Sequence, residues 1–195
     1  MKRLLLPSVA LAIALSLLVS SSASGQGRPD TGALMAAQRA ALQALSSMDG
    51  TWRGRARFKE PDGTWKDLTQ TERIGPMLDS TVKVIEGRGY DAADKKVFNA
   101  FAILSWDAGR KTFNFRSYTS GFSGDYVFAA TDSGFVWEIP AGPMTIRYTA
   151  AVRDGRWREV GDRIMPGQEP VRFIEMDLKR VGPSDWPAGG AVLPR

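Results

Sequence analysis

The chain has 195 residues, a formal net charge of +5, and neither cysteine nor histidine. Without these two residue types, a Ser-His-Asp triad, a cysteine nucleophile, a conventional zinc site and haem held by histidine or cysteine are excluded. Any chemistry must therefore come from carboxylates, Lys, Arg, Tyr or Ser side chains. The length suits one domain, which can bury a sufficient core without disulfides.

Residues 1–25 have the pattern of a secretory signal peptide. Lys2 and Arg3 precede a nearly unbroken apolar run over residues 4–19, and small residues follow it. The run is short for a membrane span, which takes about 20 apolar residues. We therefore expect cleavage after Ala23 or Gly25, a periplasmic or secreted protein, and no stable membrane anchor. Losing the two signal cations lowers the formal charge from +5 to +3, too little to indicate nucleic-acid binding.

Residues 26–49 are predicted to form a polar linker followed by one helix. Apolar residues recur at spacings of three and four between positions 34 and 48, which is typical of an amphipathic helix. Asp30 or its neighbour can cap the N-terminus, and Gly50 follows the last periodic residue. The helix has a single apolar stripe, which must cover another part of the protein.

From Gly50 the hydrophobic period changes to two and stays there. In the first strand, apolar residues alternate with a row of cations formed by Arg53, Arg55, Arg57 and Lys59. Turn residues such as Asp154-Gly155 separate the later segments. The later strands are predicted at residues 65–74, 81–90, 97–106, 112–119, 125–131, 135–139, 144–153, 156–164 and 171–181.

About ten short strands without a second helical layer would leave two exposed edges unless the sheet closes. We therefore predict an all-β fold, a closed antiparallel up-and-down barrel over residues 50–181 that is covered by the one N-terminal helix. Closure would set Glu175 and Asp177 of the last strand beside the basic row of the first, where they can pair with arginines. Residues 182–195 are predicted to be an irregular tail.

The first and last strands carry a resemblance to a known family. Gly50-Thr51-Trp52 opens the first strand after a helix, and Arg180 lies in the last strand. This resembles the calycin (lipocalin-like) plan, in which Gly-x-Trp opens the barrel. The resemblance implies that Arg180 lies across the Trp52 indole and seals one end. Haem-binding relatives use an axial histidine, which this chain lacks.

More closely, residues 38–181 resemble an uncharacterised bacterial family of exported calycin-like proteins, a domain of unknown function. Besides Gly50-Thr51-Trp52 and Arg180, the motifs that carry this resemblance are Ile85-Glu86-Gly87-Arg88-Gly89-Tyr90, Arg147, Trp157-Arg158-Glu159 and Phe173-Ile174-Glu175-Met176.

Charged residues that share strand faces are candidates for a cavity inside the barrel. The candidate set is Glu72, Glu86, Arg116, Tyr118, Arg147 and Glu159. Arg147 and Glu159 lie on adjacent strands and are expected to pair. We expect no acidic partner for Arg116 on the adjoining hairpin strand, so an inward Arg116 could bind an anionic group of a ligand. The alternatives are a mutually satisfied polar network and the outer face of the barrel.

The sequence thus predicts an exported protein that binds a small organic ligand, anionic if Arg116 is free, in a polar and aromatic cavity. No catalytic residue, metal or cofactor is assigned. An isomerase or hydrolase using Glu and Arg is the first alternative, and a structural barrel without a ligand is the second. A roomy cavity with two carboxylates and no neutralising arginine would favour the enzyme.

Overall fold

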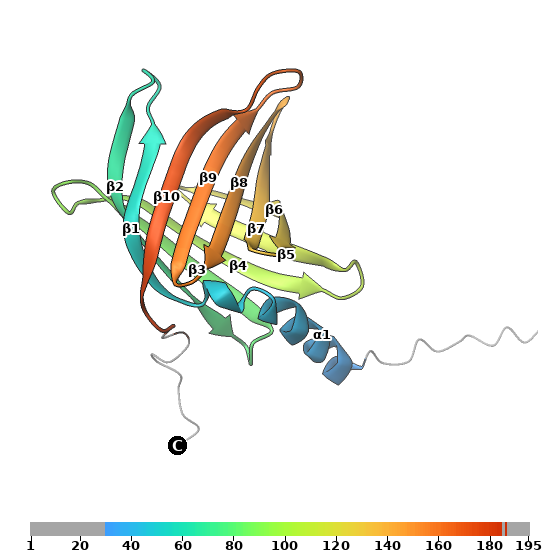
Figure 1. Cartoon of the computed structure of the whole chain (residues 1–195). Helices are drawn as coiled ribbons and strands as arrows, with labels where there is room; N and C mark the ends of the chain where they lie inside the picture. Colours follow the sequence, from blue (N-terminus) through green and yellow to red (C-terminus); the bar gives the residue numbers. More distant parts are fainter. Residues whose placement is uncertain (1–29, 185, 187–195) are drawn as a thin grey trace, which may run out of the picture.

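The computed structural model describes residues 30–184 and 186, so the predicted signal peptide and most of the predicted tail lie outside it. Its strands form one closed antiparallel barrel in which sequence neighbours pair and β1 pairs with β10, as Figure 1 shows. The predicted fold is confirmed. The strands are β1 Gly50–Lys59, β2 Trp65–Met77, β3 Val82–Tyr90, β4 Lys96–Asp107, β5 Thr112–Thr119, β6 Phe122–Thr131, β7 Gly134–Ala141, β8 Met144–Arg153, β9 Arg156–Ile164 and β10 Val171–Gly182.

Two predicted boundaries differ from the observed ones by three residues. Strand β2 continues to Met77 and does not end at residue 74, and the second difference is the start of β6. Strand β6 begins at Phe122 and not near residue 125. The cause is a two-residue turn, in which Ser120 and Gly121 both have positive φ, 49° and 83°. Turns of this kind match the twist of an antiparallel hairpin and let pairing start at once. Thr119 and Phe122 accordingly face each other as the first pair of the hairpin.

Two helical segments lie across one end of the barrel (Figure 1). They are α1 (Thr31–Gln43) and the 3-10 helix η1 (Ser46–Met48). The Asp30 side chain caps α1 by accepting a hydrogen bond from Ala33 N. Leu42, Leu45 and Met48 are buried in the same cluster as the barrel core. The stripe predicted from the sequence therefore closes the barrel end. Among the described residues, no helix is long and apolar enough to cross a membrane.

The closed end is sealed by the first and last strands, as the resemblance implies. Trp52 is opposite Arg180 in the strand pairing, and the Arg180 guanidinium lies 4.7 Å from the centroid of the indole ring. Trp52 Nε1 donates to the Met48 carbonyl at 2.8 Å, and Arg180 Nη2 donates to the Ser47 carbonyl at 2.7 Å. These contacts tie β1, β10 and η1 together. An ion pair between the buried Lys83 of β3 and the partly buried Asp49 adds a second link there.

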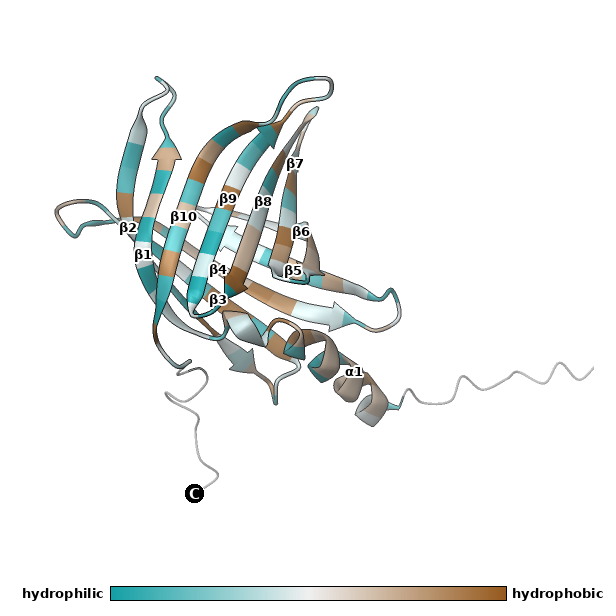
Figure 2. Ribbon diagram, viewed as in Figure 1, coloured by the Kyte–Doolittle hydropathy of each residue, from teal (hydrophilic) through white to brown (hydrophobic). Residues whose placement is uncertain are grey.

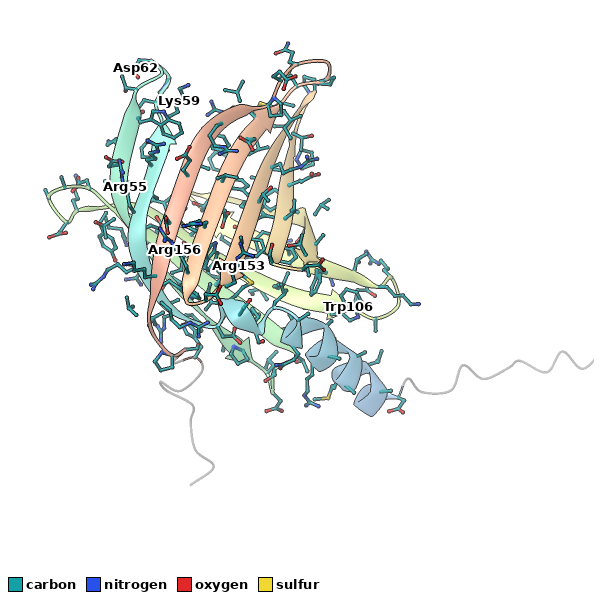
Figure 3. The ribbon with its side chains drawn as sticks, in the orientation of Figure 1. Arg55, Lys59, Asp62, Trp106, Arg153 and Arg156 are labelled. Carbon is teal, nitrogen blue, oxygen red and sulfur yellow. The ribbon has the colours of Figure 1, made fainter. Side chains whose placement is uncertain are left out.

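The strands alternate between an apolar inner face and a polar outer face, which Figure 2 shows as alternating brown and teal along β1, β10 and β9. Arg55 and Arg156, labelled in Figure 3, lie on the outer side of this wall. The predicted pairing of Glu175 with the basic row is confirmed, because Arg57 Nη2 lies 2.7 Å from Glu175 Oε2. Asp177 instead pairs with Arg156 of β9.

Candidate functional site

The barrel holds a cavity of about 540 Å³. It reaches from Met48 at the closed end to Val97, Phe98 and Phe122 at the other, where these three side chains are exposed to solvent. Its walls are mainly apolar and aromatic, with a few polar groups among them. The polar and charged residues that line it are Arg57 at its mouth, whose side chain belongs to the outer basic row, and Lys66, Gln70, Glu72, Ser117, Thr119, Tyr126, Tyr148 and Glu159.

Two of the six predicted cavity residues, Glu72 and Glu159, line this cavity. Glu72 is on β2 and Glu159 on β9. Because β2 and β9 each pair with one side of the β1–β10 pair, the two carboxyls enter the cavity from the same side of the barrel. Strand alternation puts both on the inner face, Glu72 together with Gln70 and Glu159 together with Trp157.

Glu86, Arg116, Tyr118 and Arg147 lie on the outer face, and the prediction that they face the cavity is wrong. Glu86 accepts hydrogen bonds from Arg88 on its own strand. Arg116 binds Asp125 on β6 and the Tyr118 hydroxyl. The physical reason is strand phase, because the inner positions of β3 and β5 are held by residues such as Ile85, Gly87, Phe115 and Ser117.

The expected pairing of Arg147 with Glu159 is also wrong. Arg147 Nε donates instead to Glu138 of β7 at 2.6 Å, and the Arg147 side chain is 48% exposed. The strand pairing sets Arg147 opposite Asp162 and Glu159 opposite Ala150. Positions 147 and 150 are an odd number of residues apart on one strand, so they lie on opposite faces.

Glu72 sits where the opposite strand leaves space for it. Gln70 Nε2 donates to Glu72 Oε1 at 2.7 Å. Gly87 of β3 is directly opposite Glu72, and a Cβ at position 87 would lie 2.8 Å from Oε1. Any larger residue there would displace the carboxyl. Burial raises the pKa of Glu72 to about 8, and the negative charges of Glu159 and Glu86 add to the increase. The hydrogen bond from Gln70 opposes it.

Glu159 is held by two indole groups. Trp157 Nε1 donates to Oε2 at 3.0 Å, and Trp137 Nε1 lies 3.4 Å from Oε1. Burial raises the pKa of Glu159 to about 7, although the two indole hydrogen bonds oppose that increase. Both donors are neutral, so they orient the carboxyl without neutralising its charge.

An aromatic wall stands beside Glu159. Trp137 and Tyr148 stack with their ring centroids 4.1 Å apart and their planes 5° apart, and Tyr126 is 5.9 Å from Trp137. Burial and the charge of Glu159 raise the pKa of Tyr148 to about 12, so its hydroxyl stays protonated at neutral pH. The wall thus combines electron-rich ring faces with two hydroxyl groups.

Neither carboxyl has an ion-pair partner among residues 30–184 and 186. The ion pairs found there lie on the outer face, at the barrel mouth or at the closed end. Nor do three or more potential metal ligands of the His, Cys, Asp and Glu types gather anywhere in those residues. The site is therefore an acidic, aromatic region at the inner part of an otherwise apolar cavity.

Sequence reasoning missed the neutral members of this site, namely Gln70, Tyr126, Trp137, Tyr148 and Trp157. A usable signal was present in the strand phase. On β5, Phe113 and Phe115 point to one face, and Asn114, Arg116 and Tyr118 point to the other. The two phenylalanines mark the inner face, because aromatic side chains fill a barrel interior more favourably than these polar ones do. Applied to β7, the same rule selects Phe135 and Trp137.

The outer position of Arg147 gives a first testable expectation. Replacing Arg147 with methionine should change the free energy of unfolding by less than about 1 kcal/mol, because an ion pair this exposed to water contributes little. Chemical denaturation measures this change. A loss of about 3 kcal/mol or more would indicate a buried pair and contradict the observed placement.

The strand number, the helix-capped end and the Trp52–Arg180 contact together define a calycin-like β-barrel. Among solved structures, the chain is similar in fold to the crystal structure of Rv2717c from M. tuberculosis, with a TM-score of 0.54 and 15% sequence identity over 72% of this chain and 96% of that one. This likeness concerns the fold alone. No family model matches the sequence, and no match was found among the curated proteins.

Proposed function

We propose that the protein is an exported member of a bacterial calycin-like family and binds a small organic molecule inside its barrel. The observation that carries this proposal is the cavity of about 540 Å³, lined by aromatic and apolar side chains with a few polar groups at its inner part. Cavities of this size and composition are typical of small-molecule sites. Barrels that serve only as scaffolds fill their interior with side chains. Export is proposed from the N-terminal sequence pattern.

The polarity of the site changes what ligand is expected. An anionic ligand was inferred from an inward Arg116, but Arg116 is on the outer face and paired with Asp125. The charged groups at the inner part of the cavity are the carboxyls of Glu72 and Glu159. At the inner part of the cavity, the ligand therefore meets an acidic region and not a guanidinium.

A cavity-filling variant tests the proposal. Native mass spectrometry of exported wild-type protein should detect a retained ligand, or the protein should bind the neutral apolar fluorophore N-phenyl-1-naphthylamine. Ser117→Trp adds a large side chain inside the cavity and should abolish both signals. Asn114→Trp, on the exposed face of the same strand, is the matched control and should retain them. Equal binding by the two variants, or no binding by the wild type, would refute the proposal.

An enzyme is the second candidate function, because two carboxyls with raised pKa values line one cavity without a neutralising arginine. With a pKa of about 8, Glu72 is mostly protonated at neutral pH and could act as a general acid, while Glu159, at about 7, could act as a base. The fold does not decide between the two functions. Mass spectrometry of a retained ligand over time would show conversion by the wild type and none by Glu159→Gln.

A further inference from the structure

We propose that the ligand carries an organic ammonium group on an apolar body, and that Glu159 and Glu72 hold the ammonium group at the inner part of the cavity. This inference rests on the proposed binding function. It follows from three properties of the cavity, which are the charge of its inner part, the aromatic wall beside Glu159, and the apolar lining toward the mouth.

The first property is uncompensated acidity. The groups that hydrogen-bond the two carboxyls are the amide of Gln70 and the indoles of Trp137 and Trp157, all of them neutral. No lysine or arginine of residues 30–184 and 186 forms an ion pair with either carboxyl. Buried carboxylates are costly without a cationic partner. A ligand cation would supply that missing partner.

The second property is the aromatic wall. Tyr126, Trp137 and Tyr148 line the cavity, and the Trp137 indole also reaches Glu159. Faces of Trp and Tyr attract cations, and aromatic residues combined with carboxylates are a common way to recognise organic ammonium groups. Because the rings and the carboxyl are joined by a hydrogen bond, a single cationic group can contact both.

The third property is the apolar lining toward the mouth, where Phe58, Val97, Phe98 and Phe122 line the cavity. Two cations, Arg57 and Lys66, also reach this region. Arg57 is bound by Glu175, and Lys66 lies 3.9 Å from Glu60. Both therefore already have acidic partners, so this region suits the alkyl or aryl body of a ligand.

The same arrangement makes binding depend on proton release. A carboxyl must be ionised to hold a cation, and burial raises the pKa values of both carboxyls toward and above neutrality. The titratable and charged groups around them are Tyr126 and Tyr148 within the cavity, Arg163 near Tyr148, Glu86 outside near Glu72, and Arg57 and Lys66 toward the mouth. Affinity for a cation should therefore rise with pH between about 6 and 9. Each proton that binding releases increases the affinity by up to about tenfold for every pH unit.

Titration calorimetry with three probes of equal chain length tests this inference. Octylamine stays protonated in this pH range, as a lysine side chain does, whereas 1-octanol is neutral and octanoate is anionic. We expect octylamine to bind at least about tenfold tighter than octanol at pH 9 and to lose that advantage at pH 6. Octanol affinity should not vary with pH.

Variants at the carboxyls provide the control. Glu159→Gln should lower octylamine affinity at pH 9 by at least about tenfold and leave octanol affinity unchanged. Glu138→Gln removes a carboxyl on the outer face and should change neither. Melting temperatures establish that both variants are folded.

The outcomes separate the inference from the proposed function. Octanol or octanoate binding as tightly as octylamine at pH 9 would overturn the ammonium inference and leave small-molecule binding in place. The same holds if N-phenyl-1-naphthylamine binds and none of the three probes does. If neither the fluorophore nor any probe binds, both proposals fail.

Discussion

Replacing Trp52 with alanine is expected to lower the free energy of unfolding by about 3–5 kcal/mol. The indole is 1% exposed, packs edge-to-face on Trp157 with centroids 5.8 Å apart, and lies under the Arg180 guanidinium. The variant leaves a cavity at the closed end and removes the donor to the Met48 carbonyl. It also removes a cation–π contact worth on the order of 1 kcal/mol. Chemical denaturation with a two-state fit measures the loss.

Trp65→Ala provides the matched control, because it deletes the same side chain from an exposed position near the mouth. Trp65 is 36% exposed and is covered on one side by the Arg57 guanidinium, 4.7 Å from its ring centroid. We expect a loss of about 1 kcal/mol or less. Equal losses for the two variants would mean that the closed end does not depend on the Trp52–Arg180 contact.

The fold could be predicted from the sequence because three independent features of the sequence indicate the same fold. The period of two, the turn residues between strands and the need to eliminate two sheet edges lead to a closed barrel without any distant comparison. The predicted start of β6 lies three residues beyond the observed one, because Ser120 and Gly121 form a short turn where the prediction has a longer loop. Pro76 inside β2 shows the same limit, since proline usually marks the end of a strand.

The cavity could be predicted only in part, because alternation gives two faces without saying which is inside. One error was avoidable. The two-residue turn at Asp154-Gly155 places Arg153 opposite Arg156, and counting back along both strands sets Glu159 opposite Ala150. Arg147 therefore could not share the face of Glu159. The inward Lys83 could not be foreseen, since its partner Asp49 comes from the end of η1 and not from a paired strand.

The cavity volume could not be predicted from the sequence. It depends on whether the inward side chains of ten strands fill the space they surround, which composition does not determine. Six tryptophans and nine phenylalanines could have filled the barrel completely. The structure shows that part of this aromatic content packs the closed end, where Trp52, Phe135 and Trp157 meet edge-to-face, and part surrounds open space.

Raising the pH from 5 to 9 is expected to destabilise the wild type by about 6 kcal/mol more than the double variant Glu72→Gln/Glu159→Gln. In the folded protein, burial raises the pKa of Glu72 from 4.5 to about 8 and that of Glu159 from 4.5 to about 7. In the unfolded chain both pKa values return to the ordinary range. Urea denaturation at a series of pH values, applied to both proteins, measures the difference.

The sign follows from proton binding. Between about pH 4.5 and 8 the folded state holds protons that the unfolded chain has released, so stability is full below that window and falls as pH rises through the folded pKa values. Burial lowers the pKa of Lys83 and raises that of Tyr148, but both groups are present in the two proteins and cancel in the difference. Glu138→Gln, which changes an outer carboxyl, should follow the wild type. If the free energies of unfolding of the wild type and the double variant change with pH in the same way, the two carboxyls are as well solvated in the folded protein as in the unfolded chain. The cavity would then not be the acidic, dry site that its lining indicates.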